Sequence, residues 1–241
     1  VDTTRFGYVA EKLLTQGKAM FFTGVTGTGK TVVISKLLER LMPLPDEGGQ
    51  GVVPILVNYS AQTDSLVAQQ SIEAGMEKKK KTLLGAPAGR KIVVFVDDVN
   101  MPFVQEYGAQ APIEMLRQML SQGGIYDRVK LFWKDVQDTT MIAASAPPGG
   151  GRSVVTPRFS RYFNVLCMQK ASDVVMERIF CSILEGYLGD GFAPEVVSKS
   201  HPLVKASIEV YNRISSELLP TPAKSHYTFN LRDLSKVFQG M

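Results

Sequence analysis

The sequence predicts an α/β protein, with a parallel sheet of five strands between helices, followed by a small domain of helices alone. A short apolar strand runs into a glycine-rich turn and then into an amphipathic helix. Unbroken apolar segments, which are typical of buried parallel strands, alternate with helical patterns until strand patterns stop after residue 171. We therefore expect an α/β core over residues 1–168 and a helical domain over residues 169–241.

The elements follow in order along the chain. Residues 18–23 (KAMFFT) form the first expected strand, and apolar residues at helical spacing up to Met42 indicate the first helix. The other core strands are expected at 52–60, 92–98, 139–145 and 162–168, and the other helices at 63–81, 113–121, 172–188, 194–219 and 231–239. We interpret 82–91 as a tight hairpin or loop and 123–138 as an inserted β-hairpin.

Composition excludes several classes of protein. The hydrophobic content of 44% and the charged content of 21% are typical of a soluble globular protein. The net charge of +4 is mild, and the lysine run at 78–81 is interpreted as a solvated helix end, so we expect no nucleic-acid partner. Two cysteines favour a reduced intracellular protein, and two histidines argue against a Cys/His metal site. No apolar run approaches the roughly 20 residues that cross a bilayer, so we expect no membrane partner. The start at Val1 suggests a piece of something longer.

Residues 24–31 (GVTGTGKT) satisfy the phosphate-loop pattern G-x-x-x-x-G-K-[ST] between a strand and a helix. Glycines let successive N–H groups turn towards phosphate oxygens, and the helix N-terminus adds partial positive charge. Lys30 is expected on the β- and γ-phosphates, and the Thr31 hydroxyl on Mg²⁺. The predicted nucleotide-binding residues here are Gly24, Thr26, Gly27, Thr28, Gly29, Lys30, Thr31 and Val32.

Two adjacent carboxylates end the strand at residues 92–98. Asp97 is the expected partner of Thr31 and of the metal, because Mg²⁺ on nucleotide phosphates usually takes one or two protein carboxylates. Asp98 reaches the site if the strand ends there, and would otherwise cap a turn. The Asn-Lys-x-Asp pattern of guanine readers does not occur in the sequence, so adenine is favoured, with a kinase fold as the weaker alternative.

Several segments together resemble the AAA+ ATPase superfamily, and within it the third AAA+ module of an axonemal dynein heavy chain. They are VDTTRFGY, FFTGVTGTGKT, NYSAQT, FVDDVNMP, PIEMLRQMLSQGGIYDR, LFWKDVQD, SAPPGGGR, TPRFSRYF and YTFNLRDLSKVFQGM, and they cover nearly the whole chain. The resemblance implies a P-loop AAA+ core, an α-helical lid and a nucleotide, ATP or ADP with Mg²⁺, between them.

The resemblance also implies roles for residues outside the phosphate loop. Val1 and the residues up to Phe6 correspond to the segment that helps to hold adenine. Arg232 matches the lid arginine that reaches the module's own nucleotide, with a solvated helix charge as the alternative. Arg158, favoured over Arg161, matches the finger that serves the preceding module. The catalytic set is therefore Lys30, Asp98, Arg158 and Arg232.

Two departures from the family pattern predict slow turnover. Asp98 stands where these ATPases usually have glutamate, which is longer by one methylene. Ala146 stands near the usual polar sensor, although Ser145 could substitute. A misplacement of about 1 Å costs on the order of a hundredfold, and a lost donor roughly a hundred- to a thousandfold. We therefore expect a regulatory nucleotide switch, with a competent ATPase and a permanently loaded structural brace as alternatives.

The expected partners follow from the resemblance. They are the neighbouring modules of the same heavy chain and the linker of the motor, reached through the hairpin at 125–136 with Phe132 and Trp133, unless these aromatics serve core packing. Microtubules are expected to bind only through the full-length motor. The implied location is the cytoplasm, in the cytoskeleton of the ciliary axoneme.

Overall fold

A computed structural model describes residues 2–149, 151–221, 224 and 227–240. The chain forms two compact units. The first comprises residues 1–25 and 29–168, and the second comprises residues 169–241 together with 26–28 of the phosphate loop.

A five-stranded parallel sheet forms the centre of the first unit. Its strand order is β2 (Val52–Asn58), β5 (Lys91–Asp97), β8 (Thr139–Ser145), β1 (Met20–Thr23) and β9 (Asn164–Cys167). All neighbouring pairs are parallel, which confirms the predicted sheet. Since the strands run the same way, the carboxyl ends of β1, β5 and β8 lie at one edge, where Thr23 is in register with Ser145.

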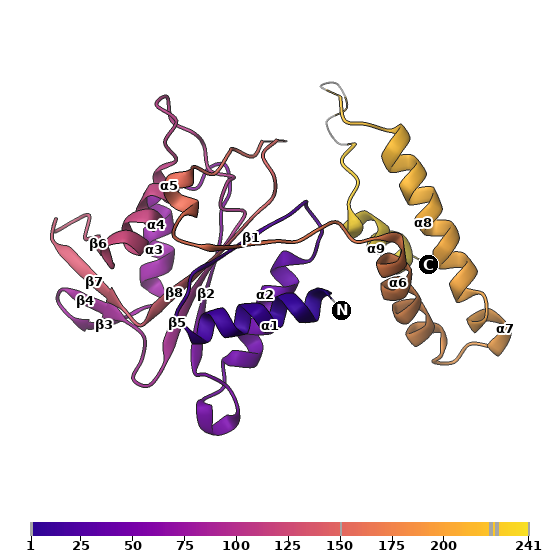
Figure 1. Cartoon of the computed structure of the whole chain (residues 1–241), viewed down its shortest axis with the longest axis horizontal. Coiled ribbons are helices and arrows are strands. Elements are labelled where there is room, and N and C mark those ends of the chain that lie inside the picture. Colours follow the sequence, from indigo (N-terminus) through magenta and orange to yellow (C-terminus); the bar gives the residue numbers. More distant parts are fainter. Residues whose placement is uncertain (1, 150, 222–223, 225–226, 241) are drawn as a thin grey trace. The chain divides into compact units, whose positions relative to one another are not determined.

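Helices cover both faces of this sheet (Figure 1). Helices α1 (Asp2–Thr15) and α2 (Lys30–Leu41) pack on one face, and α3 (Ser65–Ala74), α4 (Ala111–Gln122) and the short α5 (Pro157–Ser160) belong to the other. Side chains of β1 contribute to the hydrophobic cores on both faces of the sheet, because successive residues of a strand point to opposite faces. Met20 and Phe22 point into one core and Phe21 points into the other. A short 3₁₀ helix (Pro45–Glu47) follows α2.

Helix α1 differs from the prediction. No helix was predicted before the phosphate loop, and the residues up to Phe6 were expected only as a segment that helps to hold adenine, but residues 2–6 form the first turns of α1. Ala10 and Leu14, one helical turn apart, are the buried contacts that hold α1 on the sheet, a shorter apolar stripe than that of α2. Val1 lies outside the described residues.

A second, four-stranded sheet lies beside the core, in the order β3 (Glu77–Lys80), β4 (Leu83–Gly85), β7 (Trp133–Gln137) and β6 (Gly124–Tyr126). The antiparallel β6–β7 pair confirms the inserted hairpin. The helical prediction for residues 77–80 is wrong. Helix α3 ends before Gly75, and the lysines that follow form an exposed edge strand, where charge blocks pairing with other chains.

In its described residues the second unit has four helices, namely α6 (Asp173–Leu188), α7 (Pro194–Val197), α8 (Ser200–Glu217) and α9 (Leu231–Gly240). Their common core includes the stacked rings of Phe180 and Phe238, 4.6 Å apart. The single helix predicted over 194–219 is two helices. Pro202 explains the break, because a residue without an N–H is tolerated only in the first turn of a helix. Across the described residues, none of the helices is both long enough and apolar enough to span a membrane.

Candidate nucleotide-binding site

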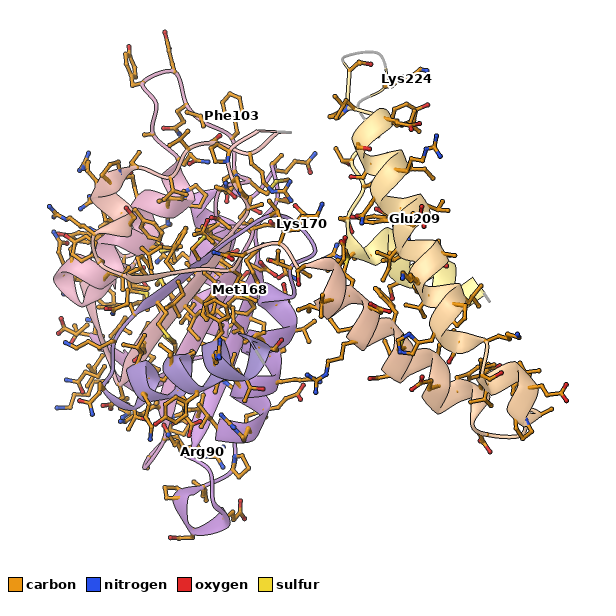
Figure 2. The ribbon with its side chains drawn as sticks, turned by 45° about the vertical axis from the view of Figure 1, so that its right-hand side comes forward. Arg90, Phe103, Met168, Lys170, Glu209 and Lys224 are labelled. Atoms are coloured by element: carbon orange, nitrogen blue, oxygen red, sulfur yellow. The ribbon has the colours of Figure 1, made fainter. Side chains whose placement is uncertain are left out.

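The loop from β1 to α2 has the backbone that the phosphate-loop pattern predicts. Gly24, Gly27 and Gly29 have positive φ angles of 155°, 85° and 85°. A Cβ on Gly24 would lie 2.3 Å from the carbonyl oxygen of Met168, which is marked in Figure 2, so only glycine fits. Among the described residues, no side chain caps α2 and no acid occupies its first turn. Its N–H groups are therefore oriented for an anion.

Lys30 occupies the first position of α2 and is 8% exposed. Its Nζ donates to the carbonyl oxygens of Gly24 at 2.7 Å and of Val25 at 3.0 Å. These hydrogen bonds hold the nearly buried ammonium close to the space that the loop surrounds. This arrangement suits a polyphosphate, which would offer it stronger acceptors.

Thr31 and Asp97 join the helix start to the end of β5. The Thr31 hydroxyl donates to Asp97 Oδ2 at 2.5 Å, and the backbone N–H of Asp98 donates to Asp97 Oδ1 at 2.9 Å. These two oxygens are hard ligands of the kind that Mg²⁺ takes. No group of three or more Asp, Glu, His or Cys side chains suited to a metal occurs in the described part of the chain. The pair therefore fits a metal ion that takes its other ligands from phosphates and water.

Asp98 has a different environment from Asp97. Its φ of 50° is left-handed, which few non-glycine residues adopt. One of its carboxylate oxygens, Oδ1, lies 3.4 Å from Nη2 of Arg152, and the Asp98 side chain is 44% exposed. Strand β5 thus ends here and the carboxylate has a cationic neighbour, while its role towards water stays a prediction.

Buried residues surround this strand end. Ser145 and Ala146, the two candidates for the sensor position, are 4% and 6% exposed. Asn100 Nδ2 donates to the carbonyl oxygens of Ala146 at 2.8 Å and of Ser153 at 3.1 Å. The side-chain amide of Asn100 thus fastens the candidate sensor loop, which runs from Ala146 to Ser153 after β8, to the end of β5.

The two candidate finger arginines differ in their contacts. Arg158, on α5, is 70% exposed at its side chain and lies 3.9 Å from Glu114 of α4. Arg161 donates to the hydroxyl of Tyr162 at 2.8 Å and lies over its ring, and this hydrogen bond lowers the pKa of Tyr162. Arg158 is therefore the freer of the two to extend towards another surface.

The remaining predicted residues fall in separate places. Arg232 is an exposed residue in the first turn of α9, a turn capped by Asn230 and Asp233. Thr26 and Thr28 cluster with the second unit, while Val32 is 55% exposed on α2. The structure brings Lys30, Thr31 and Asp97 into one site and leaves the roles of Arg158 and Arg232 as predictions.

Sequence reasoning missed Arg152 and Asn100. Both occur in segments that the sequence marks, the PPGGGR loop and the end of β5, but 52 positions separate these two residues. The contact of Arg152 with Asp98 and those of Asn100 with the loop after β8 depend on the register of β5 with β8, which the residue pattern leaves open. The sequence signal that could have pointed to Arg152 is its position as the polar residue that closes the glycine-rich PPGGGR loop.

Trp133 and Phe132 also have internal contacts. The Trp133 ring packs edge-on against Tyr126 at 5.0 Å, and its Nε1 donates to Asp135 at 2.8 Å. Phe132 lies beneath Lys81. These contacts belong to packing within the small sheet, so the linker contact stays a prediction.

Known proteins match the whole chain. A family model described as "P-loop containing dynein motor region" matches residues 1–171, and one described as "AAA+ lid domain" matches residues 203–241. Dynein axonemal heavy chain 6 of Homo sapiens is 52% identical over 240 residues, and dynein axonemal heavy chain 12 of Rattus norvegicus is 44% identical over 241 residues. Both alignments cover 100% of this chain, but only 6% and 8% of these relatives' lengths.

Proposed function

We propose that this chain, which belongs to the dynein motor family of P-loop AAA+ proteins, is an ATP- and ADP-binding module that regulates an axonemal motor through its nucleotide state. The arrangement of Lys30, Thr31 and Asp97 carries the proposal. It unites a cation for phosphate oxygens with two hard ligands for Mg²⁺ at the carboxyl edge of the sheet. The motifs of the resemblance support the third module as its place in the ring.

Different residues of the chain are proposed to bind the phosphates, the metal and the adenine. The backbone N–H groups of the phosphate loop receive the phosphates, Lys30 neutralises their charge, and Thr31 and Asp97 hold the metal. Mg²⁺ bound to the nucleotide supplies further charge neutralisation at the phosphates. Arg232 is proposed to reach the module's own nucleotide, Arg158 that of the preceding module, and Val1 the adenine.

We also propose that hydrolysis at this site is slow. Asp98 is shorter than glutamate, its backbone is left-handed, and a guanidinium lies beside its carboxylate. Ala146 offers no side-chain donor in the sensor loop. Since a displaced catalytic group costs on the order of a hundredfold, these features favour a long-lived nucleotide state over rapid turnover. Such a state shifts ring conformations by differential affinity.

The proposed partners are the neighbouring AAA+ modules and the linker, with microtubules bound only by the complete motor. The inserted β6–β7 hairpin is the candidate contact for the linker. Deletion of residues 125–136 is expected to disturb linker docking and to leave nucleotide affinity unchanged, and a large loss of ATP affinity would argue against this assignment.

Single-turnover ATP hydrolysis, with the neighbouring modules attached, tests the function. We expect the wild type to bind nucleotide tightly and hydrolyse it slowly, with Asp98→Asn changing the rate little. Brisk wild-type turnover that Asp98→Asn abolishes would instead establish a competent ATPase. Bound nucleotide that never exchanges would establish a structural brace.

A further inference from the structure

Arg152 lies beside the candidate water-orienting carboxylate, and the proposed function counts this guanidinium among the features that favour slow hydrolysis without saying how it acts. Its Nη2 is 3.4 Å from Asp98 Oδ1, and the Arg152 side chain is 21% exposed. The two residues are 54 positions apart in sequence. The contact is therefore made by the fold and is not a local turn.

The loop that carries Arg152 is fixed at both of its ends. Gly149 and Arg152 exchange backbone hydrogen bonds of 3.0 Å and 3.1 Å, which closes the glycine-rich turn. The side-chain Nδ2 of Asn100 donates to the backbone carbonyl oxygens of Ala146 and Ser153, one on either side of the turn. The backbone carbonyl oxygen of Asn100 accepts from the N–H of Ser153 at 3.0 Å. The backbone around Arg152 is thus tied to the end of β5 two residues after Asp98.

Two buried polar atoms at this turn lack a hydrogen-bond partner among the described residues. These atoms are Nε of Arg152 and Oδ1 of Asn100. Unpaired buried polar atoms are rare in folded proteins, because burial without a partner is unfavourable. Within the part of the chain that the structure describes, the guanidinium is therefore held by one long contact to Asp98, which a small rearrangement can break.

We infer that Arg152 is a positioning residue that restrains the Asp98 carboxylate, so that the sensor loop sets the rate of hydrolysis at this site. In hydrolysis, the oxygen of water bonds to the γ-phosphorus while the bond to the β,γ-bridging oxygen breaks. ADP leaves with that bond's electron pair, and the protons of water pass to phosphate and solvent. A carboxylate orients that water by accepting its hydrogen bond. Arg152 competes with water for the same oxygen of Asp98.

This inference rests on the proposed function, and it extends it by naming what keeps hydrolysis slow. An ion pair between partly exposed groups is weak, of the order of 1 kcal/mol or less. Its removal is therefore expected to raise the rate about fivefold, which corresponds to that energy. The rate of hydrolysis can therefore be adjusted, because any contact that moves Arg152 and its loop away from Asp98 would also raise it.

Single-turnover hydrolysis by the motor that contains the chain, with fluorescent ADP affinity measured in parallel, tests the inference. Arg152→Gln is expected to hydrolyse ATP about fivefold faster with ADP affinity unchanged, and Arg152→Lys, which keeps the charge, to stay near the wild-type rate. Arg152→Met, which keeps the aliphatic stem, replaces Arg152→Gln if that variant fails to fold. The double variant Asp98→Asn/Arg152→Gln is expected to show no acceleration, because the freed carboxylate is missing.

Arg90→Gln is the matched control. Arg90 immediately precedes β5 and Asp98 immediately follows it, so the two residues lie at opposite ends of the strand. Arg90→Gln is expected to leave the rate unchanged.

Three outcomes would overturn the restraint while the proposed function stands. The first is an unchanged or lower hydrolysis rate in Arg152→Gln, and the second is an acceleration that persists in the double variant. The third is an acceleration in Arg152→Lys as large as that in Arg152→Gln. Failure of the wild type to bind ADP would overturn the proposed function and the restraint with it.

Discussion

The loop after β1 and the turn after β5 lie at the same edge of the sheet, but they are built by different means. After β1, glycines adopt the positive φ angles, and Lys30 bonds to carbonyls only five and six positions away. After β5, a non-glycine residue, Asp98, adopts the left-handed backbone, and its side-chain contact comes from 54 positions away. The difference separates the phosphate loop, whose contacts are local in sequence, from the proposed site of hydrolysis, which is assembled from distant loops.

The largest expected effect is on binding. Lys30→Ala removes a cation that would donate to two phosphates, and each charge-assisted hydrogen bond contributes roughly 2 kcal/mol, so ATP affinity should fall about a thousandfold. A titration with fluorescent ATP measures it. Lys36→Ala, an exposed lysine on the same helix, is the control and should bind normally. If Lys30→Ala binds within tenfold of the wild type, the local machinery does not carry nucleotide binding.

The next effect concerns the fold of the loop. Gly24→Ala places a Cβ 2.3 Å from the carbonyl oxygen of Met168, at a φ of 155°, and is expected to lower the free energy of unfolding by about 3 kcal/mol. Gly17→Ala, at a φ of 64° but with open space around the Cβ, should cost only about 1 kcal/mol. Denaturant unfolding gives both values. Equal costs would show that the close approach to Met168 does not matter.

Thr31→Val tests whether the start of α2 and the end of β5 hold a metal together. The variant loses the hydroxyl that donates to Asp97 at 2.5 Å, so Mg²⁺-dependent ATP affinity should fall roughly tenfold. Affinity measured in EDTA should match that of the wild type, and Thr31→Ser should restore the metal dependence. An equal loss with and without Mg²⁺ would mean that the hydroxyl acts on the fold or the phosphates and not on the metal.

The same contrast explains what could be predicted from the sequence. The parallel sheet follows from apolar strands such as residues 92–96, and the phosphate loop from consecutive residues whose chemistry needs no distant partner. The pairing of Asp98 with Arg152 could not be predicted, because it depends on strand register and on the closure of a turn. Residues 77–80 were misassigned because their pairing with β4 uses backbone groups, which lysine side chains do not reveal.

The smallest effect is expected at Asp98 itself, and it isolates the backbone from the carboxylate. Asp98→Gly and Asp98→Ala both remove the contact with Arg152, so their difference reports only the φ of 50°. Alanine pays the steric cost of the left-handed region and glycine does not, so Asp98→Gly should be the more stable variant by about 1 kcal/mol. At an ordinary helical or strand position the order reverses, because glycine loses more chain entropy on folding. Denaturant midpoints of the two variants therefore decide the matter. If Asp98→Ala is instead the more stable variant, the backbone of Asp98 is not strained, and glutamate could occupy this position without a backbone cost.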